Sequence, residues 1–122
     1  MAMTEGKERL FVSNGSAMYE QVVDSEWMVM STRAQGNVAS GVYHLSDAQP
    51  AKTTGPGARY EGTIVHHDKR GNVYQSVDEG VLVKHDKSAF GRSELPAIGS
   101  VPKIQYLRGQ ALVEGRERGL ER

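Results

Sequence analysis

Short apolar and β-branched runs, separated by glycines and polar residues, are the dominant pattern along this chain. The second half shows it most regularly, with residues alternating across two faces as they do in half-buried strands. The turns between these runs carry glycine, asparagine and aspartate, as at Gly71-Asn72 and Asp78-Glu79-Gly80. The pattern therefore predicts five strands in Arg59–His66, Val73–Val77, Val81–His85, Lys103–Leu107 and Gln110–Glu114. Arg108-Gly109 is the predicted two-residue hairpin loop, and Lys87–Phe90 is predicted to form one helical turn.

The first forty residues are less regular. The apolar runs predict strands at Leu10–Val12 and Glu26–Ser31, with a further short strand at Gly41–Leu45. Ser16–Asp24 fits either a strand or a helix that begins at a Ser16 N-cap. Trp27, Met28 and Met30 are expected in the core, and an exposed methionine-rich binding surface is the alternative. Turns are predicted at Asn14-Gly15 and Gly36-Asn37.

Residues 49–58 hold two prolines, two threonines and two glycines, a composition typical of a linker. We expect a single domain over residues 1–122, with a weakly patterned part at 1–40, a β-rich core at 41–114 and a flexible tail at 115–122. The fold class that follows is mainly β. We predict a small curved sheet or barrel of about five to seven short strands, with at most one or two short helices.

The amino-acid composition argues against several classes of function. The chain has 122 residues, no cysteine, and 15 basic against 15 acidic residues. Disulfides and thiolate metal sites are therefore excluded, and the basic excess usual in general nucleic-acid binders is missing. There is neither a long apolar segment nor the apolar core of a secretory signal, so we expect no membrane contact and a cytoplasmic, bacterial location.

Four short motifs follow one another in the second half. They are Tyr60-Glu61-Gly62-Thr63-Ile64, Val73-Tyr74-Gln75, Val83-Lys84-His85, and Ile104-Gln105-Tyr106 with Gly109, preceded by a lead-in at Gly41–Leu45. This series, over residues 41–114, resembles the KfrB-type domain of conjugative-plasmid accessory proteins. The resemblance implies plasmid maintenance or transfer through association with other plasmid proteins. One such partner type is a DNA-binding protein with a long coiled coil.

The histidines suggest two candidate chemical sites. His66, His67, Asp68 and His85 have the composition of a metal site. Adjacent residues of a strand point to opposite faces, however, so no metal and no cofactor is expected. His85, Asp86 and Ser88 contain the residue types of a triad, yet no nucleophile elbow accompanies them. We therefore expect no enzyme, and a small hydrolase or metal-dependent enzyme around His66 and His85 remains one alternative.

The candidate binding residues are Lys103, Tyr106, Arg108, Tyr74 and His85. The preferred function is an accessory protein that docks onto a protein partner through an exposed sheet edge or groove. The other alternative is a nucleic-acid module with a basic-aromatic face, in which Tyr60, Lys84, Lys87 and Arg92 would take part. This nucleic-acid role is not favoured, and the sequence leaves the oligomeric state open.

Overall fold

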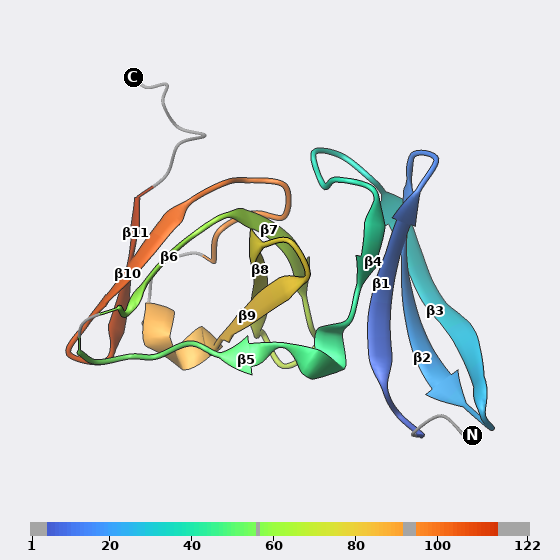
Figure 1. Ribbon diagram of the computed structural model, residues 1–122, viewed down its shortest axis with the longest axis horizontal. Helices are drawn as coiled ribbons and strands as arrows, with labels where there is room; N and C mark the ends of the chain where they lie inside the picture. The colour runs from blue at the N-terminus through green and yellow to red at the C-terminus, as the bar shows by residue number, and fades with distance from the viewer. Residues whose placement is uncertain (1–4, 56, 92–94, 115–122) are drawn as a thin grey trace. The chain divides into compact units, whose positions relative to one another are not determined.

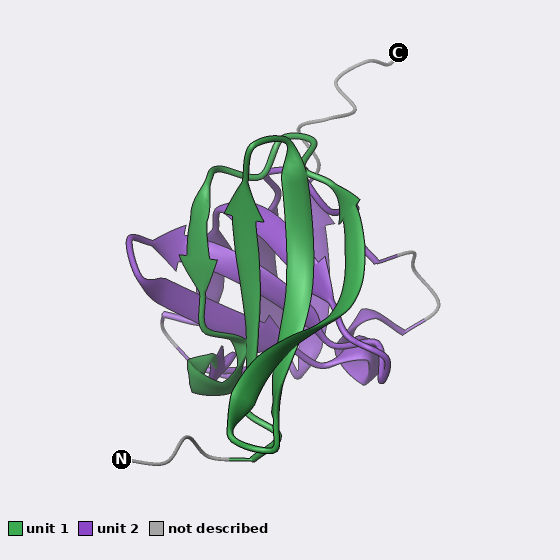
Figure 2. Ribbon diagram, turned by 90° about the vertical axis from the view of Figure 1, so that its right-hand side faces the viewer, with its two compact units in different colours: residues 1–48 green, residues 49–122 purple. Residues whose placement is uncertain are grey.

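The structure is a computed structural model that describes residues 5–55, 57–91 and 95–114. It divides the chain into two compact units, Met1–Ala48 and Gln49–Arg122 (Figure 2). The N-terminal part, weakly patterned in sequence, thus forms a unit of its own. That the whole chain behaves as a single domain stays a prediction. None of the helices in the described ranges has the length and apolar character that a bilayer crossing requires.

Unit 1 is a four-stranded antiparallel sheet in the order β3-β2-β1-β4 (Figure 1). Both of its tight turns have two central residues with positive φ, Asn14-Gly15 and Asp24-Ser25, which gives the twist that antiparallel hairpins need. The strands are β1 (Glu8–Ser13), β2 (Ser16–Val23), β3 (Glu26–Ala34) and β4 (Gly41–Tyr43), followed by the 3-10 helix η1 (Leu45–Asp47).

The helical alternative for Ser16–Asp24 is wrong, because β2 pairs with β3 from Ser16 to Val23 and with β1 from Ser16 to Gln21. Two turns of two residues bound the segment, and this local hairpin geometry outweighs the helical spacing of Ala17, Met18, Gln21 and Val22. Met28 and Met30 are about half exposed, at 50% and 47%, so the prediction that they lie in the core is also wrong. They sit on β3, the edge strand of the sheet. Trp27 is half-buried, with the Arg9 guanidinium 4.1 Å above its ring.

Unit 2 contains two further sheets (Figure 1). In one, β11-β10-β6, all pairs are antiparallel; in the other, β5-β9-β8-β7, only the β5–β9 pair is parallel. The strands are β5 (Gln49–Pro50), β6 (Arg59–Glu61), β7 (Thr63–His67), β8 (Val73–Asp78), β9 (Val81–His85), β10 (Lys103–Leu107) and β11 (Gln110–Glu114). The 3-10 helix η2 (Lys87–Phe90) confirms the predicted helical turn.

Gly62 divides what the sequence predicts as one strand, Arg59–His66, into β6 and β7 of different sheets. A Cβ at this position would lie 1.9 Å from the backbone oxygen of Ser76 on β8. The chain therefore passes directly against β8 as it changes sheet, and only glycine allows that approach. The hydrophobic core of unit 2 is formed by side chains from both of its sheets and from η2. Its buried residues include Ile64, Val73, Phe90 and Ile104.

The mainly β class is confirmed, while two details of the prediction change. The sheets do not close into a barrel, and the described residues hold eleven strands where five to seven were expected. The strands beyond the predicted segments come from β2, from the break at Gly62, and from the two-residue strand β5 inside the predicted linker.

Candidate binding surface

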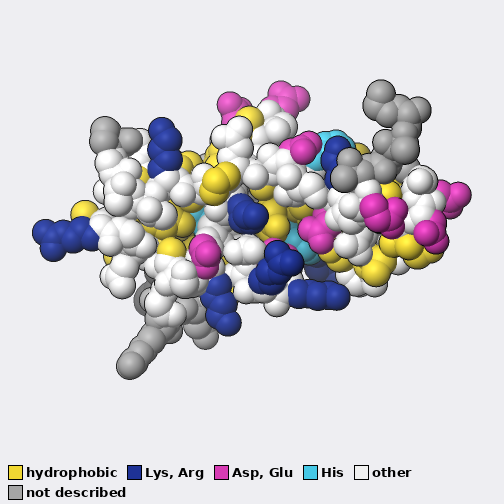
Figure 3. All heavy atoms as spheres, turned by 90° about the horizontal axis from the view of Figure 1, so that it is seen from below, with side chains coloured by type: hydrophobic (Ala, Val, Ile, Leu, Met, Phe, Trp, Pro, Cys, Tyr) yellow, Lys and Arg dark blue, Asp and Glu magenta, His cyan; other side chains and the backbone are white. Residues whose placement is uncertain are grey.

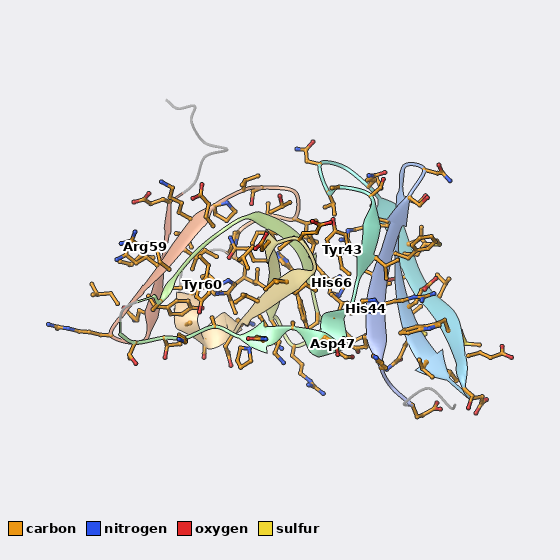
Figure 4. The ribbon with its side chains drawn as sticks, viewed as in Figure 1. Tyr43, His44, Asp47, Arg59, Tyr60 and His66 are labelled. Atoms are coloured by element: carbon orange, nitrogen blue, oxygen red, sulfur yellow. The ribbon has the colours of Figure 1, made fainter. Side chains whose placement is uncertain are left out.

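Unit 2 presents a charged sheet face with a groove on it. We call this the outer face: the side of β6, β10 and β11 that bears exposed side chains, whereas the inner side bears Ile104 and Tyr106, which are buried. Arg59 and Tyr60 are neighbours on β6 and belong to opposite sides of that strand (Figure 4). The groove encloses about 460 Å³ and is lined by Arg59, Tyr60, Glu61, Lys103, Gln105, Leu112 and Glu114.

The side chains of the outer face form two rows across the three strands. In the first row, Lys103 lies opposite Glu61 on one side and opposite Glu114 on the other. The second row joins Arg59, Gln105 and Leu112. Leu107 and Leu112 add exposed apolar surface, at 57% and 49% exposure. The face therefore offers both signs of charge together with apolar contact area, the mixture found in protein-binding surfaces.

The hairpin that ends this sheet confirms the predicted loop at Arg108-Gly109, whose φ angles of 54° and 85° suit a two-residue turn. In such a hairpin the residues flanking the loop, Leu107 and Gln110, form a hydrogen-bonded pair, and bonded and non-bonded pairs alternate from there. Tyr106 accordingly turns its N–H away from β11 and donates it to the Ala58 carbonyl, 2.8 Å away. In this sheet β10 is the central strand and β11 lies at the edge.

A chain of hydrogen bonds runs through the interior behind this sheet. The amide nitrogen Nε2 of Gln75 donates to the carbonyls of Gly62 and Pro102, at 3.0 and 3.1 Å. Its Oε1 must then accept from Nε2 of His85 at 2.8 Å, which makes Nδ1 of His85 the acceptor for the Tyr106 hydroxyl at 2.7 Å. The partners thus fix the neutral tautomer of His85 with its proton on Nε2.

Burial controls the protonation of the side chains in this hydrogen-bond network. His85 is fully buried, and this lowers the pKa of its imidazole from 6.5 to about 4. Burial, together with nearby Tyr60 and Asp86, raises the pKa of the Tyr106 hydroxyl to about 12. Tyr60 and Phe90 meet the His85 ring edge-on, at centroid distances of 5.4 and 6.2 Å. The His85 imidazole and the Tyr106 hydroxyl are therefore both uncharged at neutral pH. The cluster that they form supports the two sheets structurally.

The structure separates the predicted binding residues into two groups. Lys103 lines the groove, and Arg108 is exposed in the turn that joins β10 to β11. Tyr74, His85 and Tyr106 are buried, with at most 5% of each exposed. Tyr106 shares β10 with Lys103, whereas Tyr74 and His85 lie on β8 and β9 of the other sheet, so the five residues form no common surface. A role of all five in binding stays a prediction.

Sequence reasoning missed Arg59, Glu61, Leu112 and Glu114 on the outer face, because their clustering depends on the β6–β10 pairing of distant segments. It also missed Gln75, for which a signal existed. Gln75 shares a predicted strand face with Val73 and Val77, and a polar residue at an apolar position indicates a buried hydrogen-bonding group.

The histidine cluster considered for metal binding does not assemble around one point. His66 lies on β7 and His85 on β9, with β8 between them. Both ring nitrogens of His85 are engaged, and Nε2 of His67 lies 2.7 Å from the Pro96 carbonyl. The Asp68 carboxylate accepts from Arg70, Asn72 and Tyr74 and so closes its own turn. Within the described ranges, no three histidine or acidic side chains are placed to share a metal ion.

The arrangement of His85, Asp86 and Ser88 is that of a helix cap. Asp86 precedes η2, and its Oδ1 accepts from both the backbone N–H and the hydroxyl of Ser88, each at 2.9 Å. The ring of His85 bonds to Gln75 and Tyr106 instead of to Asp86 or Ser88. Both hydrogen-bond partners of the ring are therefore side chains.

The basic-aromatic face considered for nucleic acid is not assembled either. Tyr74 and Tyr106 are buried and Tyr60 is half-buried, so these rings do not offer the exposed faces on which bases stack. Arg92 lies outside the described residues. In the view of Figure 3, acidic side chains lie beside and between the basic ones.

The fold and surface define a small mainly β protein whose second unit presents a mixed-charge groove and, among the described residues, a sheet edge at β11. Comparison with known proteins identifies this unit. The model of the KfrB domain matches residues 59–115, which leaves the Gly41–Leu45 lead-in outside the match. The chain is also 37% identical to Protein TraB of Escherichia coli over 111 residues, 91% of this chain and 73% of TraB. The chain belongs to the KfrB-domain family, and its likeness to TraB extends into unit 1.

Proposed function

We propose that this chain is an accessory binding protein of plasmid maintenance or conjugative transfer, which acts by docking a protein partner on the outer face. The KfrB domain and the likeness to Protein TraB support a plasmid-associated accessory protein. On this proposal the chain is not an enzyme, needs no cofactor and works in the cytoplasm. A plasmid-encoded DNA-binding coiled-coil protein is the partner type suggested by the family resemblance.

The observation that carries the proposal is the groove on the outer face. Its lining combines two basic and two acidic side chains with Leu112, while Leu107 is exposed nearby. A partner surface that covers these leucines would gain apolar burial, and the paired charges around them would select the surface that fits. The buried chain from Gln75 to Tyr106 holds the inner side of β10, so the groove is preformed.

Charge reversal on this face tests the proposal. We would substitute Lys103→Glu and Arg108→Glu together and recover partners from the native host with the tagged protein. Lys103 already lies between Glu61 and Glu114, so the reversal places three acidic groups in one row. We expect loss of the co-purified partner, with a circular dichroism spectrum like that of the wild type and a modestly lower melting temperature, because like charges then face one another in the row.

The matched control carries Lys69→Glu and Arg70→Glu, two reversals at exposed positions in the turn between β7 and β8. It changes the net charge by the same amount away from the groove. Retention of the partner by the control and its loss from the Lys103/Arg108 variant supports docking on the outer face. Equal recovery with the folded Lys103/Arg108 variant would contradict it.

A further inference from the structure

We propose that β11 binds an extended segment of the partner as an additional antiparallel strand, with a basic side chain beside Glu114 and an apolar one beside Leu112. The inference rests on the proposed function, since it names the chemistry of the partner at the same face. It adds a backbone interaction at the edge of the sheet to the side-chain contacts of the groove.

The backbone of β11 has the required free groups. Gln110, Leu112 and Glu114 belong to the pairs that bond to β10, because the alternation starts at the Leu107–Gln110 pair. Ala111 and Val113 therefore turn their N–H and C=O groups away from β10. In the described part of the chain β11 pairs with β10 alone, so these groups form an open ladder of two residues.

The rows of the outer face specify which side chains the new strand brings. Reading across the sheet, the first row is acidic, basic and acidic, and it ends on Glu114 at the edge. A lysine or arginine in the next position continues the alternation of charge, whereas an acidic residue would face Glu114 directly. Glu114 thus selects a basic residue on the incoming segment.

The second row ends on Leu112, which is 49% exposed. An apolar side chain opposite Leu112 would cover it, and side chains two positions apart share a face of a strand. Every neighbouring pair in this sheet is antiparallel, and an antiparallel segment meets Glu114 before Leu112. The segment therefore reads basic, any residue, apolar in the direction of its chain.

Capped synthetic peptides test this reading on the full chain. The matched peptide is Thr-Thr-Lys-Thr-Val-Thr-Thr, and a second peptide has glutamate in place of lysine. Nitrogen-15 NMR spectra record binding through the amide signals. We expect the lysine peptide to shift the amides of Ala111 and Val113 and to slow their hydrogen exchange, and the glutamate peptide to bind roughly fivefold more weakly.

Exchange of the charge provides the decisive comparison. In Glu114→Lys the preference should invert, with the glutamate peptide binding roughly fivefold more tightly than the lysine peptide. Val113→Pro removes an outward N–H without touching the β10 ladder, and should abolish binding of both peptides, while Val113→Ala retains it. Because Glu114→Lys leaves the hairpin backbone intact, the charge test stands even if the proline variant unfolds.

Three results would overturn the inference: no amide shift at millimolar peptide, shifts that map away from β11, or equal binding of both peptides to wild type and Glu114→Lys. These outcomes are separable from failure of the proposed function. Loss of the partner by the Lys103/Arg108 variant without peptide binding keeps the docking face and rejects the added strand. Peptide binding at β11 with full partner recovery by that variant keeps the added strand and rejects the docking face.

Discussion

Tyr106 and His85 are stacked at 12° with ring centroids 5.7 Å apart, and the Tyr106 hydroxyl reaches Nδ1 of the imidazole at 2.7 Å. Tyr106 belongs to β10 of one sheet and His85 to β9 of the other. The contact is therefore a polar connection between the two sheets of the KfrB unit, made where apolar packing would be usual. Because this contact is buried between the sheets, its disruption should lower the stability of the fold rather than alter a binding surface.

Tyr106→Phe removes the hydroxyl that donates to His85 and leaves a buried acceptor without its partner. We expect the free energy of unfolding to fall by about 1 to 2 kcal/mol, measured by chemical denaturation. Tyr60→Phe is the matched control. Its hydroxyl accepts from the exposed Lys52 N–H, so the loss should be smaller. Equal losses in the two variants would contradict the role given to the buried pair.

Acid should destabilise the protein through His85. The folded-state pKa is lowered to about 4 from 6.5, so between these values the unfolded chain binds the proton and the folded chain does not. Stability is then fully present above pH 6.5 and decreases as the pH falls toward 4, by up to about 3 kcal/mol. An NMR titration of the ring, assigned by loss of its signal in His85→Asn, should show a midpoint near pH 4. A midpoint near 6.5 in the folded state would refute this.

Gly62→Ala should prevent the second unit from folding normally. The added methyl group would lie 1.9 Å from the Ser76 oxygen, and backbone must move to admit it. We expect a loss of at least about 3 kcal/mol, or no cooperative melt. Gly80→Ala, in an exposed turn with open space around it, should cost only about 1 kcal/mol. A Gly62→Ala protein as stable as the Gly80→Ala protein would show that the strands do not approach as described.

The second unit should fold without the first. Its core cluster is made of residues from Ala51 onward, and β5 is its first strand. A fragment of residues 49–122 is expected to give a β-type circular dichroism spectrum and a cooperative thermal melt. A broad, non-cooperative melt would mean that unit 1 supplies part of its core, and that residues 1–122 fold only as one domain.

Local turn chemistry made the last two hairpin strands predictable to the residue. Lys103–Leu107 and Gln110–Glu114 match β10 and β11. The two-residue loop at Arg108-Gly109 fixes where β10 ends, where β11 begins, and the register between them. The same holds for Val81–His85, which ends where Asp86 caps η2. The KfrB family was likewise identified from short motifs that these turns keep in order.

Features that depend on contacts between distant segments were not predictable. The pairing of β6 with β10 assembles the outer face, yet no spacing in the sequence indicates that Glu61 lies opposite Lys103. Gly62 appears in sequence as one more small residue in a strand, and its role depends on the proximity of Ser76. In β2, alanine, methionine and glutamine suit helices as well as strands, so pairing with two neighbours decides the outcome.

The irregularity in β3 has a consequence for solubility. Val29 pairs with Glu20 and Ser31 with Tyr19, so Met30 is an extra residue that bends this edge strand. Met28, Val29 and Met30 are all about half exposed, which favours association. A bent edge strand, however, cannot pair continuously with the same strand of a second copy. Deleting Met30 would remove the extra residue and is expected to straighten β3, which makes its edge a better template for pairing. The bulge thus disfavours pairing between the β3 edges of two copies of the chain.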